Sequence, residues 1–345
     1  MTRPAVSVLI DTYNHERYIE QAVVSAIEQD FPKNEFEILV VDDGSTDRTP
    51  EIVRKFGPRV RLLRKSNGGQ ASAFNAGIPE TRGQFVAFLD GDDWFAPGKL
   101  SAVMEAFDEH PDVAAVGHGY YEYHDETSRS VVCAPAEGFH AQLRGPESAR
   151  QALRAWQFLI MGALTARRAA LDRIGRLAHS LIYCADSPIA MGCIASGAWI
   201  SALPLCYYRH HASNLFAGRI GSTQKAKRSF EIKQRMYAEA EKLLLRLGVS
   251  RDCVAAFLYS TWVDDGRRDL RTLGGSRITT LRIEMLAFRA GCPRPTASYR
   301  FFKYFFVGAS TLLFSPRQFY RLRDWYGGRK LGRFRESLFK AAGSN

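Results

Sequence analysis

The sequence predicts an α/β fold with a mostly parallel sheet and helices on both of its faces, followed by a mainly helical, basic C-terminal region. Over about the first 120 residues, short apolar segments alternate with segments of helical periodicity, which is the order of a parallel sheet covered on both sides. The apolar segments lack polar alternation, which indicates strands buried on both faces. After about residue 220 the pattern becomes helical and the charge becomes positive.

The individual elements follow from the same periodicities. Strands are expected at 5–10, 36–41, 60–64 and 84–89, with helices at 16–29, 47–56 and 70–80 between them. We expect Ser45 or Thr46 to begin the second helix. A further strand is expected within HPDVAAVG (110–117), and helices are expected at 224–247, 251–273 and 276–290. These elements predict a sheet domain over residues 1–215 and a helical region over residues 216–345.

Composition limits the class of protein. The chain has 345 residues, 46% of them hydrophobic, which is enough to bury a sizeable core in one large domain with an appendage or in two domains. Its six cysteines have no metal-knuckle spacing, so we expect reduced thiols in a cytoplasmic protein. The N-terminus enters a strand-like segment without a signal-peptide layout.

The charge is unevenly distributed along the chain. Residues 219–340 hold 26 of the 47 basic residues and 10 of the 36 acidic ones, which leaves 21 basic against 26 acidic residues elsewhere. A basic C-terminal part and a more acidic remainder of the chain indicate two functional regions. The basic surface suits anionic lipid, a polyanionic substrate or nucleic acid as a partner.

Polar segments follow the expected strands at the edge where ligands bind in parallel sheets. They are DTYN (11–14), DDGSTD (42–47) and DGDD (90–93), and NGGQASAFNAG (67–77) adds a glycine turn that runs into a helix. Any one of them alone would be read as an ordinary turn or helix cap. Together they predict a site of the size of a nucleotide.

Four ordered segments resemble the family 2 glycosyltransferases, which have the GT-A fold. They are VSVLIDTYNHERYIEQAV, EILVVDDGSTDRTPEIV, NGGQASAFNAGI and VAFLDGDDWFAPGKL, and the resemblance covers about residues 5–215. It implies transfer of a sugar from a nucleoside-diphosphate sugar to an acceptor hydroxyl, with inversion and with a divalent cation. Asp11 departs from the family, which more often has proline there.

The resemblance assigns the metal to the DGD segment. Asp90 and Asp92 match the DxD motif of the family, where a Mg²⁺ or Mn²⁺ ion would neutralise both the carboxylates and the diphosphate. Asp92 is the first choice as a metal ligand, and Asp90 is expected to face the sugar or ribose or to share the metal. We expect Asp93 to cap the following helix.

The resemblance also assigns the nucleotide. Asp43 matches the position that binds the base, where a carboxylate accepts from the imide N–H of uracil, thymine or guanine. UDP, dTDP and GDP donors are therefore expected. Thr12 and Tyr13 end the first strand, where the Tyr13 ring could lie against the base or pack in the core. Asn14 is expected to hold the turn.

The remaining site residues come from later segments. Asp186 in CADSPIAMG matches the general base of the family, and the alternative is a simple helix cap. Arg209 and His211 in YYRHH could pair with the diphosphate or, for His211, complete the metal shell, and the alternative is a structural strand end. Gly69 and Asn75 are carried over as donor-binding positions.

The C-terminal segment has several open interpretations. Residues 301–345 hold 12 aromatic, 9 basic and 2 acidic residues, while 301–314 is shorter than the roughly 20 apolar residues of a membrane span. We expect contact of residues 301–340 with the inner face of the cell membrane, or docking on the catalytic domain or on a second subunit. Nucleic acid is the least favoured partner. A glycan or lipid-linked acceptor would suit membrane contact.

Two other functions compete with sugar transfer. A nucleotidyltransferase would need a glycine-rich phosphate loop after the first strand, and DTYNHERY has no glycine. A non-catalytic nucleotide-sugar-binding protein would not need Asp43, Asp90, Asp92 and Asp186 together.

Overall fold

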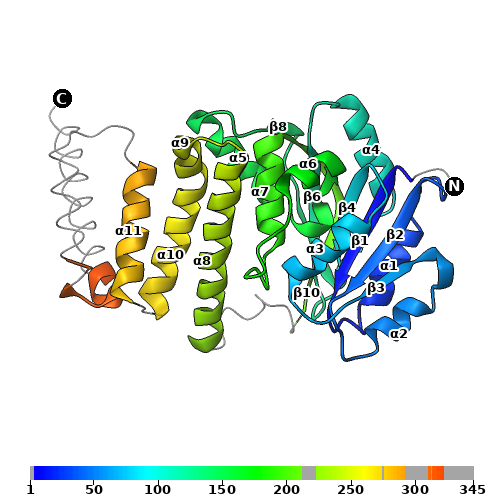
Figure 1. The fold of residues 1–345 in the computed structure, drawn as a ribbon, viewed down its shortest axis with the longest axis horizontal. Helices are drawn as coiled ribbons and strands as arrows, with labels where there is room; N and C mark the ends of the chain where they lie inside the picture. The colour runs from blue at the N-terminus through cyan, green and yellow to red at the C-terminus, as the bar shows by residue number, and fades with distance from the viewer. Residues whose placement is uncertain (1–3, 212–222, 274–275, 292–309, 312, 322–345) are drawn as a thin grey trace, which may run out of the picture. The chain divides into compact units, whose positions relative to one another are not determined.

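A computed structural model describes residues 4–211, 223–273, 276–291, 310–311 and 313–321 (Figure 1). The chain forms two compact units, Met1–Gly218 with Arg235–Phe257, and Arg219–Gln234 with Leu258–Asn345. The division at residue 215 stays a prediction.

The first four strands form the parallel half of the sheet. They are β1 (Val6–Thr12), β2 (Phe36–Asp42), β3 (Arg61–Arg64) and β4 (Phe85–Asp90), in the spatial order β3-β2-β1-β4. Each pair in this half is parallel, so the four strands end at the same edge. The predicted strands differ from these by at most two residues at either end.

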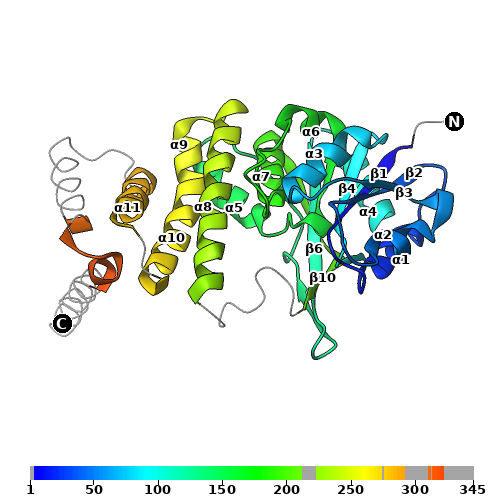
Figure 2. The same cartoon turned by 60° about the horizontal axis from the view of Figure 1, so that its bottom comes forward.

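The second half of the sheet is mixed. It continues from β4 through β9 (Thr165–Arg167), β6 (Ala115–His124), β10 (Ala198–His210) and β5 (Trp94–Phe95), with β7 (Arg129–Cys133) beside β6 and β8 (Phe139–Ala141) beside β10. β6 and β10 are parallel and run side by side (Figure 2), whereas β9, β5, β7 and β8 pair antiparallel.

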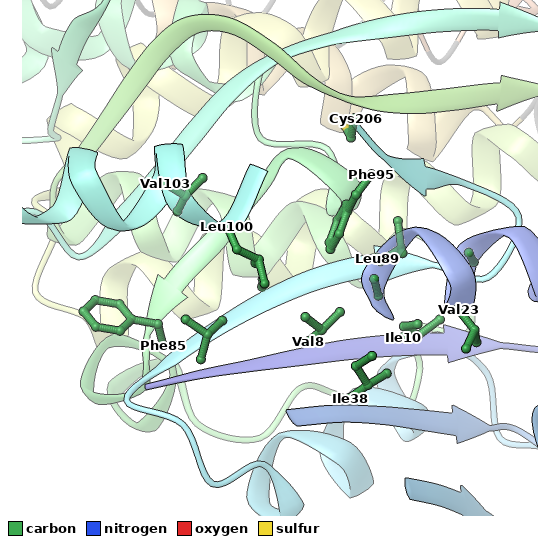
Figure 3. Packing of buried hydrophobic residues seen from close by; sticks show 14 of the residues in the cluster. Val8, Ile10, Val23, Ile38, Phe85, Leu89, Phe95, Leu100, Val103 and Cys206 are labelled. Carbon is green, nitrogen blue, oxygen red and sulfur yellow. The ribbon is translucent and has the colours of Figure 1, made fainter. Parts of the chain in front are cut away.

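Helices cover both faces of the parallel half, as predicted. On one face, α1 (Ile19–Ile27), α2 (Thr49–Arg54) and α4 (Lys99–Glu109) bury their apolar residues against β1, β2 and β4. Figure 3 shows Val23 of α1 next to Ile10 of β1, in a cluster that also holds Leu100 of α4 and Leu89 of β4. On the other face lies α3 (Gln70–Glu80), whose Phe74 ring contacts Phe88 with centroids 5.7 Å apart.

The second helix begins later than predicted. Its first residue is Thr49, whose backbone N–H donates to Asp47 Oδ1 at 3.0 Å. Ser45 and Thr46 do not cap this helix, because both hydrogen-bond to Asn14 instead. The loop between Asp43 and Asp47 is therefore tied to the end of β1.

The remaining helices of the first unit follow the sheet strands. They are α5 (Ala149–Trp156), α6 (Arg168–Ile174), α7 (Asp186–Ser196) and α9 (Arg251–Val254), and short 3₁₀ turns lie at Gly57–Arg59, Pro146–Ser148 and Met161–Ala163. The five described cysteines form no disulfide with one another.

Helices dominate the basic C-terminal part, also as predicted. α8 (Thr223–Arg246) contributes to both units, a π-helical turn spans Ala255–Tyr259, and α10 (Ser260–Leu273) and α11 (Arg277–Gly291) follow. Arg267 of α10 donates two hydrogen bonds to Glu284 of α11, at 2.8 and 2.6 Å. In the part of the chain that is described, no helix has the length and apolarity to cross a membrane. Most of residues 301–340, for which membrane contact is predicted, lies outside the described residues.

Candidate active site

The end of β1 forms one wall of the site. Asn14 has a positive φ of 56°, and its side-chain oxygen accepts from the Thr46 backbone N–H at 2.8 Å, so it holds the turn as expected. Tyr13 is 44% exposed, which makes the core-packing alternative wrong and leaves its ring accessible. Thr12 is buried, and its hydroxyl lies 3.2 Å from His15 Nδ1.

The acidic pair after β2 is neutralised by the protein. Asp43 accepts from the Gly69 backbone N–H at 2.6 Å and from Gly68 at 3.1 Å, and it pairs with Lys65 Nζ at 2.6 Å. Asp42 is fully buried and lies 3.1 Å from Arg64 Nε. The acceptor positions of the Asp43 carboxylate are thus filled, so a nucleotide base could pair with it only by displacing one of these donors.

The glycine turn before α3 has a structural cause. Gly69 has φ +84°, and a Cβ there would lie 2.6 Å from the Ile182 Cα, so only glycine allows the close approach of these two backbones. Gln70 begins α3, accepts from the Ala185 backbone N–H at 2.9 Å and approaches Asp90 Oδ1 at 3.5 Å. This turn therefore links the DGD segment to the start of α7.

Asn75 lies farther along α3. Its amide nitrogen donates to the Leu177 carbonyl at 2.9 Å, and its amide oxygen accepts from the Leu177 backbone N–H at 2.8 Å. Both polar atoms are engaged with the chain, so its donor-binding role stays a prediction.

The carboxylates after β4 are not neutralised in the same way. Asp11 and Asp90 are opposite each other in the parallel register of β1 and β4. Burial, with added repulsion from Asp92 and Asp186, raises the pKa of Asp11 to about 7. Burial, followed by the charges of Asp11 and Asp93, raises the pKa of Asp90 well above its usual value. Among the described residues, no lysine or arginine forms an ion pair with Asp90 or Asp11.

Asp93 does not cap a helix, which corrects the prediction. α4 begins only at Lys99, after Gly98, whereas Asp93 is buried and accepts from the Arg209 backbone N–H at 2.8 Å. Burial raises its pKa well above the usual value, and the charge of Asp92 adds to this. Asp93 thus holds the end of β10 against the DGD turn.

Arg209 forms structural hydrogen bonds that join β10 to the DGD turn and to other segments. Its guanidinium donates to the Asp92 carbonyl at 2.8 Å, to Asp125 Oδ1 at 2.8 Å and to Gln21 Oε1 at 2.5 Å. It also lies over the Trp94 ring, 4.4 Å from the centroid. These contacts favour the structural alternative, and a diphosphate contact of Arg209 stays a prediction without geometric support.

Two histidines meet the Asp92 carboxylate. His211 Nε2 lies 3.0 Å from Asp92 Oδ2, and His15 Nε2 lies 3.9 Å from the same oxygen. Burial works to raise the pKa of Asp92, but the hydrogen bond with His211 and the charges of both histidines bring it below its usual value. Burial lowers the pKa of His15. Asp92 is therefore an ionised carboxylate beside an imidazole.

Asp186 is the first residue of α7, where the sequence places it. Burial raises its pKa, although hydrogen bonds with backbone groups and with Ser187 oppose the rise. Its charge in turn raises the pKa values of Asp11 and Asp90, so it lies near these two carboxylates. The chain does not use it as a side-chain cap for α7.

The cluster fits a divalent cation. The carboxylate oxygens of Asp90 and Asp92 are ligands that Mg²⁺ and Mn²⁺ prefer, and His211, whose Nε2 lies 3.0 Å from Asp92 Oδ2, would add a nitrogen ligand, which suits Mn²⁺ better than Mg²⁺. The raised pKa of Asp90 and the buried Oδ1 of Asp11, which has no hydrogen-bond partner among the described residues, mark charge that the protein leaves unbalanced.

Sequence reasoning missed three residues of this site. His15 approaches Asp92, Lys65 neutralises Asp43, and Gln70 joins Asp90 to the backbone of Ala185. His15 directly follows the polar segment 11–14, Gln70 lies within the segment 67–77, and Lys65 lies two residues before that same segment. Their position there was the only available signal, because each partner is distant in sequence.

The chain is similar in sequence to known glycosyltransferases. A family model described as Glycosyl transferase family 2 matches residues 7–175. An uncharacterized glycosyltransferase of Nostoc sp. (strain PCC 7120) is 30% identical over 230 residues, which cover 64% of this chain and 70% of the relative. Poly(ribitol-phosphate) beta-N-acetylglucosaminyltransferase TarS of Staphylococcus aureus (strain Mu50) is 41% identical over 108 residues, which cover 30% of this chain and 19% of TarS.

A solved structure has the same fold. The crystal structure of S. aureus TarS 1–349 in complex with UDP-GlcNAc matches with a TM-score of 0.56 and 20% identity, over 88% of this chain and 90% of that one. The GT-A-type fold that the resemblance implies is thereby confirmed. The comparisons do not favour the nucleotidyltransferase or the non-catalytic alternative.

Proposed function

The chain belongs to glycosyltransferase family 2 and is a nucleotide-sugar glycosyltransferase, and from this premise we propose that it transfers the sugar with inversion, assisted by a divalent cation. The observation that carries the proposal is the end of β4, where Asp92 follows the unbalanced carboxylate of Asp90, whose pKa the nearby charges of Asp92 and Asp186 help to raise. The acceptor is a hydroxyl of a glycan, of a lipid-linked molecule or of another cell-envelope component.

Asp186 acts as the general base in this proposal. An acceptor hydroxyl is a weak nucleophile, and it needs its proton removed as the new bond forms. Burial raises the pKa of Asp186 toward the working pH, which makes its carboxylate a better proton acceptor than an exposed aspartate. Attack from the Asp186 side, opposite the departing diphosphate, inverts the anomeric carbon.

Asp92, Asp90 and His211 would hold the cation. When bound, a Mg²⁺ or Mn²⁺ ion would supply Lewis-acid stabilisation of the negative charge on the diphosphate. The chain itself presets the ligands, because Asp93 and Arg209 join the DGD turn to β10 just before His211. Loss of either contact would move two ligands at once.

The donor nucleotide would bind at the ends of β1 and β2. Tyr13 offers an exposed ring for the base, and Asn14 fixes the turn that carries it. In this proposal the imide N–H of UDP, dTDP or GDP replaces one of the donors that Asp43 now accepts from. The crystal structure of TarS 1–349 is a complex with UDP-GlcNAc, which supports a donor with a uracil base.

The proposal also includes a polymeric acceptor and contact with the cell membrane. TarS is a poly(ribitol-phosphate) beta-N-acetylglucosaminyltransferase, and its similarity to this chain supports a polymeric acceptor. Peripheral contact with the cytoplasmic face of the membrane through residues 301–340 stays a prediction.

A nucleotide panel tests the donor proposal. We expect UDP, dTDP or GDP to bind with Mn²⁺ more tightly than ADP and CDP in calorimetric titrations, because only the first three carry an imide N–H. The matched control is the same panel with chelator in place of Mn²⁺. Equal affinities for all five nucleotides would remove Asp43 from the base site, and no binding of any of them would contradict the function.

A further inference from the structure

The ends of β6 and β10 bring two histidines and a glutamate to one face of the sheet. In the parallel register, Glu122 is opposite Tyr208 and His124 is opposite His210. Alternate residues of a strand point to the same face, so Glu122, His124 and His210 share a face while Arg209 points to the other. The group thus lies on the reverse side of the strand that carries the contacts to the DGD turn.

The three side chains are close enough to share one ion. One ligand atom from each lies within 4.8 Å of the other two, and His210 Nε2 is 3.8 Å from Glu122 Oε2. The imidazole rings of His124 and His210 are stacked at 4.5 Å with an angle of 9°. Zinc–ligand bonds of about 2.0–2.2 Å hold neighbouring ligand atoms about 3–4 Å apart, so the two imidazoles would complete the site by turning out of their parallel stack until both ring planes meet at the ion.

One of the ligand atoms lacks a hydrogen bond. His210 Nε2 is buried and has no hydrogen-bond partner among the described residues. A buried polar atom without a partner is costly and rare in folded proteins. The Tyr208 ring packs edge-on against His210 with centroids 4.9 Å apart.

We propose that Glu122, His124 and His210 bind one Zn²⁺ ion at a site separate from Asp92. Two imidazole nitrogens and one carboxylate oxygen are ligands that Zn²⁺ prefers, whereas Mg²⁺ takes oxygen ligands and keeps its waters. Glu122 and His210 side chains are 34% and 33% exposed, so water can supply the fourth ligand.

The ion would act on the active site through the backbone. It would clamp the end of β10 to β6 immediately before His211, whose Nε2 contacts Asp92. Zn²⁺ would therefore stabilise the folded chain and fix the position of His211. This site does not depend on the proposed transfer reaction, because its ligands lie on the opposite face of the strand.

Zinc binding by the full chain tests the site. The protein is prepared without a histidine tag, treated with chelator, and titrated with Zn²⁺ by equilibrium dialysis with metal analysis. The variants are His210→Ala and Glu122→Gln. The matched controls are His179→Ala, which removes an exposed histidine elsewhere, and Asp92→Asn, which disables the other metal site.

The proposal expects one Zn²⁺ per chain in the wild type and in both controls. His210→Ala and Glu122→Gln should bind at least about tenfold more weakly, since loss of even an outer-shell partner costs about 10–100-fold. Zn²⁺ should raise the melting temperature of the wild type but not of these two variants. Glu122→Gln is nearly isosteric, so it tests the site even if His210→Ala fails to fold.

Three results would overturn the site. They are the absence of stoichiometric Zn²⁺ in the wild type, unchanged affinity in Glu122→Gln, and loss of binding in Asp92→Asn alone. The last result would place the zinc at the DGD carboxylates.

Discussion

The two acidic loops at the edge of the sheet differ in how the chain treats their charge. After β2, Asp43 is neutralised by Lys65 and two backbone N–H groups, and Asp42 by Arg64. After β4, Asp90 has no cationic side chain among the described residues, and its pKa is raised mainly by burial. Asp42 and Asp43 therefore stabilise a loop of the protein, whereas Asp90 has no positive charge from the described chain to balance it.

This difference explains the dense acidic segment FLDGDDW (88–94). Folding alone would not favour several buried carboxylates that repel one another. A divalent cation would bring in positive charge that balances both the carboxylates and the diphosphate of the donor. The segment is thus better explained by ligand binding than by stability.

The largest expected effect concerns the general base. Asp186→Asn preserves the shape of the side chain but removes the proton acceptor, so single-turnover transfer with saturating donor should fall about 10²–10⁴-fold. Donor affinity should be nearly unchanged, because Asp186 does not bind the nucleotide. A rate within about threefold of the wild type would mean that Asp186 only begins α7, since asparagine serves at a helix start about as well as aspartate.

Removing a neutralised carboxylate should destabilise the chain. Asp43→Ala leaves the buried backbone N–H of Gly69 without its acceptor, which costs about 1–3 kcal/mol. Urea unfolding should therefore show a lower free energy of unfolding, with an unchanged m-value. The matched variant Asp90→Asn removes an unbalanced charge and should not lower the stability of the metal-free chain. If Asp43→Ala and Asp90→Asn lowered the free energy of unfolding equally, the proposed difference between the two acidic loops would be wrong.

Removing an unbalanced carboxylate should stabilise the metal-free chain at high pH. The pKa of Asp11 is about 7 in the folded chain and 3.8 ordinarily, so the folded state binds the extra proton and loses stability as the pH rises through 7. Relative to Asp11→Asn, the wild type should lose about 1.4 kcal/mol between pH 6 and pH 8 in the presence of chelator. A stability difference that does not change with pH would show that Asp11 is ionised throughout.

Local sequence patterns predicted the parallel half of the fold well. Each of the first four strands carries its own apolar signal, so β1 to β4 were found with errors of at most two residues. The polar segments after these strands also placed the acidic loops at one edge. Asp186, which the family resemblance singled out at the start of an expected helix, is the first residue of α7. These features depend on neighbouring residues and on the geometry of a parallel sheet.

Contacts between distant segments were not predictable in the same way. Arg209 donates to Gln21, 188 residues away, and Asp93 accepts from the Arg209 backbone 116 residues away. Asp93 therefore looked like a helix cap when only its neighbours were considered. The two-residue β5 and three-residue β9 are also too short to carry a periodicity of their own.

The central claim is that the carboxylates after β4 hold a divalent cation for the donor. The most direct measurement is a calorimetric titration of UDP into the wild type and Asp92→Asn, each with Mn²⁺ and with chelator. The account predicts that Mn²⁺ strengthens UDP binding in the wild type and has no effect in the variant, whose melting transition remains cooperative. A variant that retains the same Mn²⁺-dependent gain in affinity would contradict the account.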